Sequence, residues 1–234
     1  MADGPSPTPS ENCQAGGNVS AMEVQVAPAH YIKEKYLSLH RFISYFYQID
    51  AVRLAKGNTI LLIGVGDNVI PDLLRKFPNY TVTTVDIDEA LVPDIVADVR
   101  KLPFPDASFD VVCAFEILEH LPFEETEKAI KEIARVAKRT VLVSVPHRRS
   151  GFELVFRFPY ARSVLKNSYA RITALFPVRF PGFIVSTQHH WEIDGRCMTL
   201  KRFRNALTPY FVIEKEETPV LDSYLRFFTL CKKT

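Results

Sequence analysis

The chain has 234 residues, of which 47% are hydrophobic and 24% charged, and its formal net charge is +2. This length suits one domain with a sizeable core. The near-neutral charge gives no overall field that favours nucleic acid or a membrane surface. No basic and apolar leader follows Met1, no apolar run approaches the about 20 residues that span a bilayer, and the four cysteines form no CxxC pair. We therefore expect a cytoplasmic protein in a reducing compartment.

The first quarter of the chain divides into a polar tail and a helix. Residues 1–28 are rich in Pro, Ser, Gly and Asn and poor in large apolar side chains, so we expect them to be disordered. Between residues 30 and 55, aromatic and aliphatic side chains recur at three- and four-residue steps, which predicts a helix within 29–56. This helix either packs on a sheet or caps the mouth of a binding site. Residues 29–234 are predicted to form a single domain.

A strand, a glycine turn and a helix follow. The continuous apolar run Thr59–Val65 is typical of a parallel strand covered on both faces. Gly64 and Gly66 allow the backbone to turn sharply and to approach a ligand without a Cβ in the way. A helix is predicted over Val69–Phe77, with Asp67 or Asn68 able to cap its first amides.

Three acidic residues stand at the ends of three further strands. Asp86 ends the predicted strand 81–86, Asp98 follows a short strand at 94–97, and Glu116 follows the strand 108–115. The carboxyl ends of the strands in an open α/β sheet form the crevice where nucleotides bind, and an acid there can accept hydrogen bonds from ribose hydroxyls. The order of these features predicts a pocket for a nucleoside joined to a charged tail.

The rest of the chain continues the alternation of strands and helices. Helices are predicted over 122–138 and 199–207, and strands over 140–145, 210–217 and 224–231. The alternation predicts an α/β, Rossmann-like, doubly wound and mostly parallel seven-stranded sheet with helices on both faces. A long basic and aromatic insertion follows the fifth strand.

Four segments resemble the class I S-adenosylmethionine-dependent methyltransferases, most of all their type 11 small-molecule group. They are IGVGDN (63–68), VDID (85–88), ADVRKLPFPDASFDVV (97–112) and FEILEHL (115–121). The resemblance implies S-adenosylmethionine as the cofactor and a final strand that runs antiparallel. It places the cofactor contacts at Gly64, Gly66, Asp67, Asp86, Ile87, Asp98, Val99 and Glu116. In this family pattern Asp86 holds the ribose, Asp98 the adenine amine, and Glu116 lies near the methionine end.

Two positions depart from the family pattern. Leu62 stands where the family usually has an acid, and Asn68 stands where it usually has a third glycine. Asp67 could replace the missing acid. These departures motivate an alternative, a non-catalytic S-adenosylmethionine-binding protein with a degenerate fold. An NAD-dependent oxidoreductase is a weaker alternative for two reasons. Val69 occupies the third glycine position of GxGxxG, and the segment 97–112 around Asp98 resembles the methyltransferases instead.

The insertion, which we place at 148–198, is the expected source of substrate specificity. Residues 148–181 combine seven Lys and Arg with seven Phe and Tyr against one acid, and the segment is too long for a simple connection, so we expect a lid. A cationic amphipathic helix is predicted over 161–176. Two interpretations stay open, a lid helix with solvated cations and a helix that meets a membrane surface or an anionic amphiphile. Single-stranded nucleic acid is a minor option.

Histidines supply the candidate catalytic groups. The sulfonium methyl is already activated, so the protein must align an acceptor and, for a hydroxyl or protonated amine, remove a proton. His147 and His190 are the candidate catalytic bases, and His120 and Trp191 are candidates for substrate contact. We expect no metal site, because His189 and His190 are adjacent and no other ligand lies at helical or hairpin spacing. The expected reaction is methyl transfer to a small-molecule or lipid-like acceptor, with an anionic acceptor among the candidates.

Overall fold

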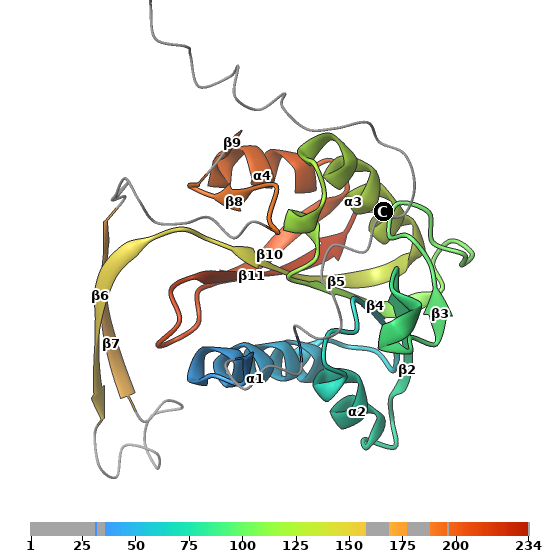
Figure 1. The fold of residues 1–234 in the computed structure, drawn as a ribbon, viewed down its shortest axis with the longest axis horizontal. Coiled ribbons are helices and arrows are strands. Elements are labelled where there is room, and N and C mark those ends of the chain that lie inside the picture. The colour runs from blue at the N-terminus through green and yellow to red at the C-terminus, as the bar shows by residue number, and fades with distance from the viewer. Residues whose placement is uncertain (1–30, 32–35, 158–168, 177–187, 196, 234) are drawn as a thin grey trace, which may run out of the picture.

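The computed structural model describes residues 31, 36–157, 169–176, 188–195 and 197–233 (Figure 1). The predicted disordered tail 1–28 and much of the predicted insertion helix lie outside these residues. Among the residues that the structure describes, no helix is both long and apolar enough to cross a membrane.

One seven-stranded sheet forms the centre of the molecule, in the order β10-β11-β5-β4-β1-β2-β3. Its strands are β1 (Thr59–Ile63), β2 (Thr81–Asp86), β3 (Ile95–Val96), β4 (Phe109–Phe115), β5 (Ala137–Pro146), β10 (Phe211–Glu217) and β11 (Leu225–Lys232). Neighbouring strands from β3 to β5 pair in parallel, and β11 pairs antiparallel with both β5 and β10. The predicted fold class and the antiparallel last strand are confirmed.

Helices cover both faces of the sheet (Figure 1). They are α1 (Leu39–Leu54), α2 (Val69–Arg75), α3 (Phe123–Val136) and α4 (Leu200–Leu207). Alternate residues of β1 point to opposite sides, as the two-residue period of a strand requires. Ile60 and Leu62 join one core with α1 and α2, whereas Leu61 and Ile63 join the other with α3 and α4.

The first helix is shorter than its apolar pattern predicts. It begins at Leu39, where the Ser38 side chain caps it by accepting a hydrogen bond from the Arg41 amide. The aromatic residues Tyr31 and Tyr36 therefore lie in the chain before the helix. The helical prediction was wrong at Tyr31 and over 36–38, because the periodic spacing of the tyrosines was counted without the serine cap; residues 30 and 32–35 lie outside the described residues.

The insertion contains a β-hairpin, so the predicted amphipathic helix was wrong over residues 169–176. β6 (Ser150–Arg157) and β7 (Tyr169–Phe176) pair antiparallel and extend from the body of the molecule (Figure 1). Phe152, Leu154 and Phe156 are exposed while the residues between them are half-buried, which is the two-residue period of a strand. A short parallel pair, β8 (Glu192–Ile193) and β9 (Cys197–Met198), follows.

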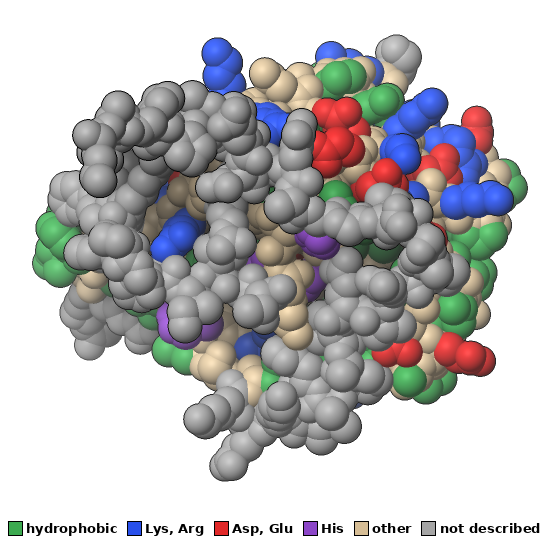
Figure 2. Space-filling model, turned by 45° about the horizontal axis from the view of Figure 1, so that its top comes forward, with side chains coloured by type: hydrophobic (Ala, Val, Ile, Leu, Met, Phe, Trp, Pro, Cys, Tyr) green, Lys and Arg blue, Asp and Glu red, His purple; other side chains and the backbone are tan. Residues whose placement is uncertain are grey.

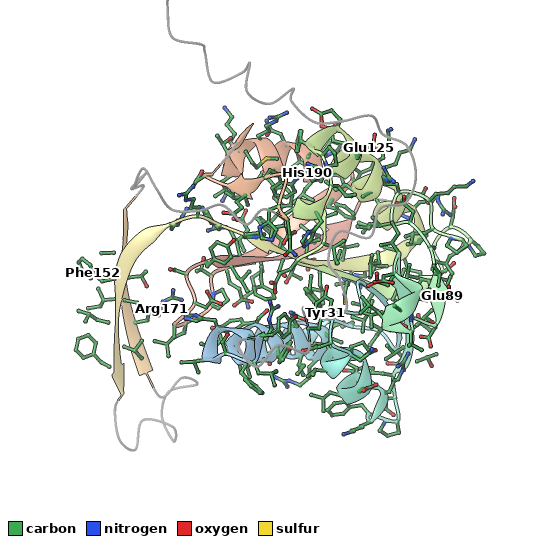
Figure 3. The ribbon with its side chains drawn as sticks, viewed as in Figure 1. Tyr31, Glu89, Glu125, Phe152, Arg171 and His190 are labelled. Atoms are coloured by element: carbon green, nitrogen blue, oxygen red, sulfur yellow. The ribbon has the colours of Figure 1, made fainter. Side chains whose placement is uncertain are left out.

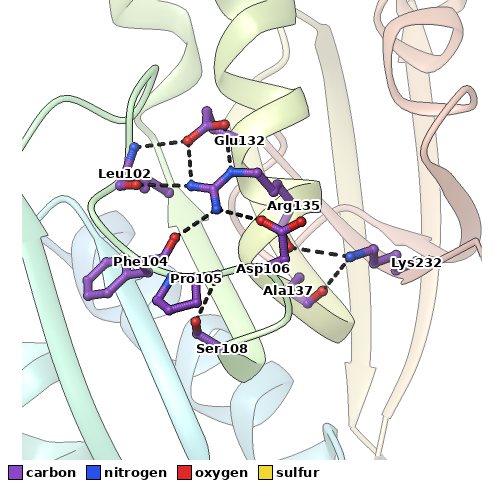
Figure 4. Close-up of polar contacts among 9 residues, drawn as sticks. All are labelled: Leu102, Phe104, Pro105, Asp106, Ser108, Glu132, Arg135, Ala137 and Lys232. Atoms are coloured by element: carbon purple, nitrogen blue, oxygen red, sulfur yellow. Dashed lines mark hydrogen bonds and ion pairs between the residues drawn. The ribbon is translucent and has the colours of Figure 1, made fainter.

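Arg135 on α3 holds the loop between β3 and β4 (Figure 4). Its guanidinium donates to the carbonyl oxygens of Leu102 and Phe104 at 3.0 and 2.7 Å. It also pairs with Asp106 and Glu132, and the Glu132 carboxylate accepts the Leu102 amide at 3.0 Å. One side chain therefore satisfies backbone groups of a loop that starts next to Asp98.

Replacing this arginine tests its structural role. We expect Arg135→Met to lower the free energy of unfolding by about 1–3 kcal/mol, because it leaves loop carbonyls without their donor. Arg139→Met is the matched control, since Arg139 is exposed on the neighbouring strand. Urea denaturation measures both variants. Equal stability of the two would contradict the assigned role.

Candidate cofactor and acceptor site

The turn after β1 has room for glycine alone at one position. Gly64 has φ +86°, and a Cβ added to it would lie 2.1 Å from Cδ1 of Ile117. Gly66 has φ +58° and faces Tyr31 at van der Waals distance. Asn68 also adopts a left-handed conformation, with φ 63°, and its side-chain amide donates to the Leu91 carbonyl. Asparagine tolerates this conformation better than most residues, so the departure from the family glycine preserves the turn.

Asp86 connects the glycine turn to the end of β2. Its carboxylate accepts the amides of Val65 at 2.8 Å and Asp88 at 3.0 Å. The side chain lines a small cavity at the carboxyl ends of β1 and β4. Its position is the one that the sequence predicts for a ribose-binding acid.

Asp98 lies just after β3, and its carboxylate is paired with Arg100 in the same loop. Burial acts to raise the pKa of Asp98, but hydrogen bonds from Arg100 outweigh it and hold the pKa below its usual value. Arg100 also pairs with Glu125 on α3, at 3.1 Å. Asp98, the buried Val99 and Ile87 are not among the residues that line the cavity.

The smaller of two adjoining cavities has a volume of about 150 Å³. Its described wall includes Gly64, Val65, Gly66, Asp67, Asp86, Glu116, His120 and His189, together with Tyr31, Tyr36, Arg41, Tyr45 and Leu62. Figure 3 places Tyr31 next to α1. The structure therefore brings Gly64, Gly66, Asp67, Asp86, Glu116 and His120 together, as the sequence predicts. Leu62, at the family's acidic position, also lies in this wall.

Helix α1 supplies contacts that the sequence analysis did not assign. Arg41 approaches the Glu116 carboxylate at 3.2 Å, and the Ser44 hydroxyl donates to it at 3.0 Å. Glu116 is held in a left-handed conformation, with φ 55°, directly after β4. The Tyr45 hydroxyl bonds to Asp67. The sequence left open whether this helix packs on the sheet or lies at the binding site. In the structure it packs on the sheet and also lines the cavity.

The larger cavity, of about 760 Å³, adjoins the smaller one, and both are lined by Tyr36, Arg41 and Glu116. Its remaining described lining is Ser38, His40, Ser44, Glu153, Leu221, Asp222, Ser223, Tyr224 and Leu225. The described residues of this wall thus offer three carboxyl groups against one arginine and one histidine. Burial raises the pKa of Asp222 above its usual value.

The hairpin contributes Glu153 to the described wall of the larger cavity. The Glu153 carboxylate lines it and accepts the Leu221 amide at 2.9 Å. Arg171 donates to the Thr218 carbonyl at 2.9 Å. In Figure 3 Phe152 points away from the body of the molecule, whereas Arg171 lies on the side of the hairpin that faces it.

The four histidines near the strand ends differ in their surroundings. His120 and His189 line the smaller cavity, and their rings meet edge to face with centroids 5.0 Å apart. His190 is exposed and does not line either cavity, although its amide donates to the Glu119 carbonyl at 2.8 Å. Histidine side chains are visible near the centre of the face shown in Figure 2, beside the residues drawn in grey.

His147 is fully buried and lies outside both cavity walls. Its Nε2 is 2.9 Å from Asp194 and accepts from Arg149, and Arg226 approaches Nδ1. Burial, with the two nearby arginines, lowers the pKa of His147 to about 4. These contacts describe a neutral imidazole fixed in the structure.

Trp191 is also fully buried. Its indole N–H donates to the Leu121 carbonyl at 3.0 Å and to the Thr126 hydroxyl at 3.2 Å, and its ring packs on Phe203. The structure places it in the core between α3 and α4, not at a cavity wall.

The fold is similar to that of solved methyltransferase structures. A S-adenosylmethionine-dependent methyltransferase from Aquifex aeolicus aligns with a TM-score of 0.58 at 13% identity, covering 89% of this chain and all of the other. Magnesium protoporphyrin IX methyltransferase from Synechocystis, crystallised with S-adenosylhomocysteine, aligns with a TM-score of 0.55 at 16% identity, covering 96% and 93%. At these identities the likeness concerns the fold.

Residues 61–144 match the family model described as "Methyltransferase domain". Over residues 61–144 this match confirms the resemblance to methyltransferases that the sequence motifs predict. The 27-O-demethylrifamycin SV methyltransferase of Amycolatopsis mediterranei is 35% identical over 88 residues, covering 38% of this chain. The 2-methyl-6-phytyl-1,4-hydroquinone methyltransferase of Synechocystis is 35% identical over 100 residues, covering 36%. The chain spans 30% of the length of each of these two relatives.

The burial of His147 makes a prediction about pH. Its pKa is about 4 in the folded protein against 6.5 for the unperturbed group, so the unfolded chain binds the proton more readily between these values. Stability should therefore be full above pH 6.5 and fall as the pH drops towards 4, by about 3 kcal/mol in total. A His147→Gln variant should lose this contribution. NMR titration of the His147 ring protons measures the pKa directly, and a midpoint near 6.5 would contradict the account.

Proposed function

We propose that the protein is a S-adenosylmethionine-dependent methyltransferase that acts on a small, neutral, hydroxyl-bearing acceptor. The observation that carries this proposal is the pair of adjoining cavities that meet at Arg41 and Glu116. One has the glycine turn and the ribose-position acid, and the other is large enough for a small molecule. Sites for small molecules usually have about 300–1,000 Å³.

The smaller cavity suits the cofactor in its chemistry. Asp67, Asp86 and Glu116 give it three carboxylates, which complement the positive sulfonium and amine of the cofactor. When bound, the cofactor supplies an electrophilic methyl group. Since its volume is below the usual range for small-molecule sites, we infer that wall side chains such as Tyr31 move outward on binding.

We assign roles to the chain's own residues from their positions. Gly64 and Gly66 let the backbone approach the cofactor, and Asp86 accepts from the ribose. Asp98 and Val99 are assigned to the adenine side. To bind the adenine amine, Asp98 must give up part of its hydrogen bonding with Arg100. Arg41 orients Glu116 at the boundary between the cavities.

The composition of the larger wall favours a neutral acceptor over an anionic one. Among the described residues three carboxyl groups line it, and the arginine in this wall is already paired with Glu116, as Glu153 is with Arg171 at 2.6 Å. Burying an anion beside these carboxylates would be costly. The two relatives named above, whose printed names describe a rifamycin and a hydroquinone as their substrates, support a hydroxylated small molecule.

His120 and His189 are the histidines at the wall of the cofactor cavity, so we assign to them the handling of the acceptor's reacting atom. The positions of His147 and His190 outside both walls do not favour a direct role for either in proton transfer. Removing a proton from the acceptor requires a group within hydrogen-bond reach of it.

A second candidate is a protein that binds S-adenosylmethionine without transferring its methyl group. It is favoured by Leu62, which lines the cofactor cavity where the family usually has an acid. Detecting transfer of a labelled methyl group to any acceptor would exclude this candidate.

Substitution of Asp86 tests the cofactor assignment. Asp86→Ala should abolish calorimetrically detectable binding of S-adenosylmethionine, because the ribose loses its acceptor and the glycine turn loses the bond to Val65. Asp72→Ala, an exposed acid on α2, is the matched control and should bind as the wild type does. Circular dichroism checks that both variants fold. Undiminished binding by folded Asp86→Ala would refute the assignment.

Substitution of Ser223 tests the acceptor assignment, because this residue lines only the larger cavity. Ser223→Trp should raise the KM for an acceptor found in a screen of hydroxylated aromatic compounds by on the order of tenfold, since its side chain fills part of the cavity. The Kd for S-adenosylmethionine should stay unchanged, and Ser223→Ala serves as the control. An unchanged KM would place the acceptor elsewhere.

A further inference from the structure

A buried carboxylate without a partner lies beside the cofactor cavity. The 3-10 turn Leu118–His120, which follows β4, places Glu119 in the interior with 0% of its surface exposed. Both of its carboxylate oxygens lack a hydrogen-bond partner among the described residues. Burial raises the pKa of Glu119 well above its usual range. A buried carboxyl group without partners is costly, so its retention calls for an explanation.

Two histidines complete a cluster around this carboxylate. His120 is the next residue along the chain, and His189 comes from the segment that returns after the insertion. One ligand atom from each of Glu119, His120 and His189 lies within 4.8 Å of the others. The two segments are joined by their backbones, because the His190 amide donates to the Glu119 carbonyl at 2.8 Å.

Both histidine rings have partners of the kind that orient metal ligands. Nδ1 of His120 lies 3.0 Å from the Gln188 carbonyl, and Nδ1 of His189 lies 2.9 Å from the Glu192 carboxylate. Glu192 is itself buried and accepts from the Tyr224 hydroxyl at 2.7 Å. Metal-binding histidines almost always use their second nitrogen in this way, which fixes the ring and its tautomer.

We propose that Glu119, His120 and His189 bind a divalent transition-metal cation. Two imidazoles and one carboxylate form a ligand set suited to Zn²⁺ and to neighbouring first-row ions such as Co²⁺, and three protein ligands leave a coordination position open. In this assignment Nε2 of each histidine faces the cation. Glu116 stays outside the ligand set, since Arg41 and Ser44 hold it.

The position of the cation gives it a function that rests on the proposed methyl transfer. Because His120 and His189 line the cofactor cavity, a cation held by them would lie at the wall of that cavity. An acceptor hydroxyl bound there would have a lowered pKa. In the transfer its O–H bond would break with the proton passing to water, an O–CH₃ bond would form, and the S–CH₃ bond would break with its electron pair remaining on sulfur. The site therefore selects acceptors that offer an oxygen atom.

This metal site was not foreseen from the sequence, where His189 and His190 had no further ligand at a regular spacing. Glu119 and His120 are supplied by a loop about seventy residues earlier, and only the folded sheet brings the two segments together. His189, not the adjacent and exposed His190, is the histidine that joins the cluster.

Metal titration of the full chain, free of any affinity tag and stripped with EDTA, tests the site. CoCl₂ should produce visible absorption bands of one bound ion per chain, and ZnCl₂ should abolish them by competition. Glu119→Gln and His189→Ala should each weaken Co²⁺ binding by on the order of tenfold or more. His190→Ala, which removes the neighbouring histidine, should bind as the wild type does.

The outcomes are distinguishable from failure of the methyltransferase proposal. Asp86→Ala should still bind Co²⁺, so a loss of cofactor binding leaves the metal result readable. Glu119→Gln and His189→Ala test the site separately, so one of them suffices if the other fails to fold. Circular dichroism identifies a variant that fails to fold. Absence of Co²⁺ and Zn²⁺ binding by the wild type, or equal weakening in His189→Ala and His190→Ala, would overturn the proposal.

Discussion

Burial of the central strands on both faces is the constraint on which the site depends. Residues Ile60–Ile63 of β1 and Val111–Ala114 of β4 are almost completely covered by helices, so polar side chains have no place along them. Parallel strands also end at one common edge. Asp67, Asp86 and Glu116 therefore lie at that edge, where they line one cavity.

The pair between Arg41 and Glu116 organises this edge. About a quarter of each side chain is exposed, 25% and 22%, and both line the two cavities. The pair joins α1 to the end of β4, two elements that are far apart in the chain. The boundary between the cofactor and acceptor regions is thus formed by side chains from the first helix and the centre of the sheet.

The fold and the cofactor side of the site could be predicted because their signals are local. Apolar runs, the glycine turn after β1 and an acid such as Asp86 at a strand end each identify themselves within a few residues. The acceptor side could not, since Arg41 and Glu153, which line the same cavity, come from segments far apart in the chain. The hairpin was mistaken for a helix because basic and apolar residues in 169–176 fit both periods. His147 and Trp191 were assigned to the site from proximity in sequence, whereas burial places them within the fold.

The central claim is that this edge of the sheet binds S-adenosylmethionine and donates its methyl group. The most direct measurement is calorimetric titration of the wild-type protein with S-adenosylmethionine, S-adenosylhomocysteine and NADH in parallel. The account predicts one site per chain for both adenosyl ligands and no binding of NADH. Binding of NADH, or of neither adenosyl ligand, would contradict it.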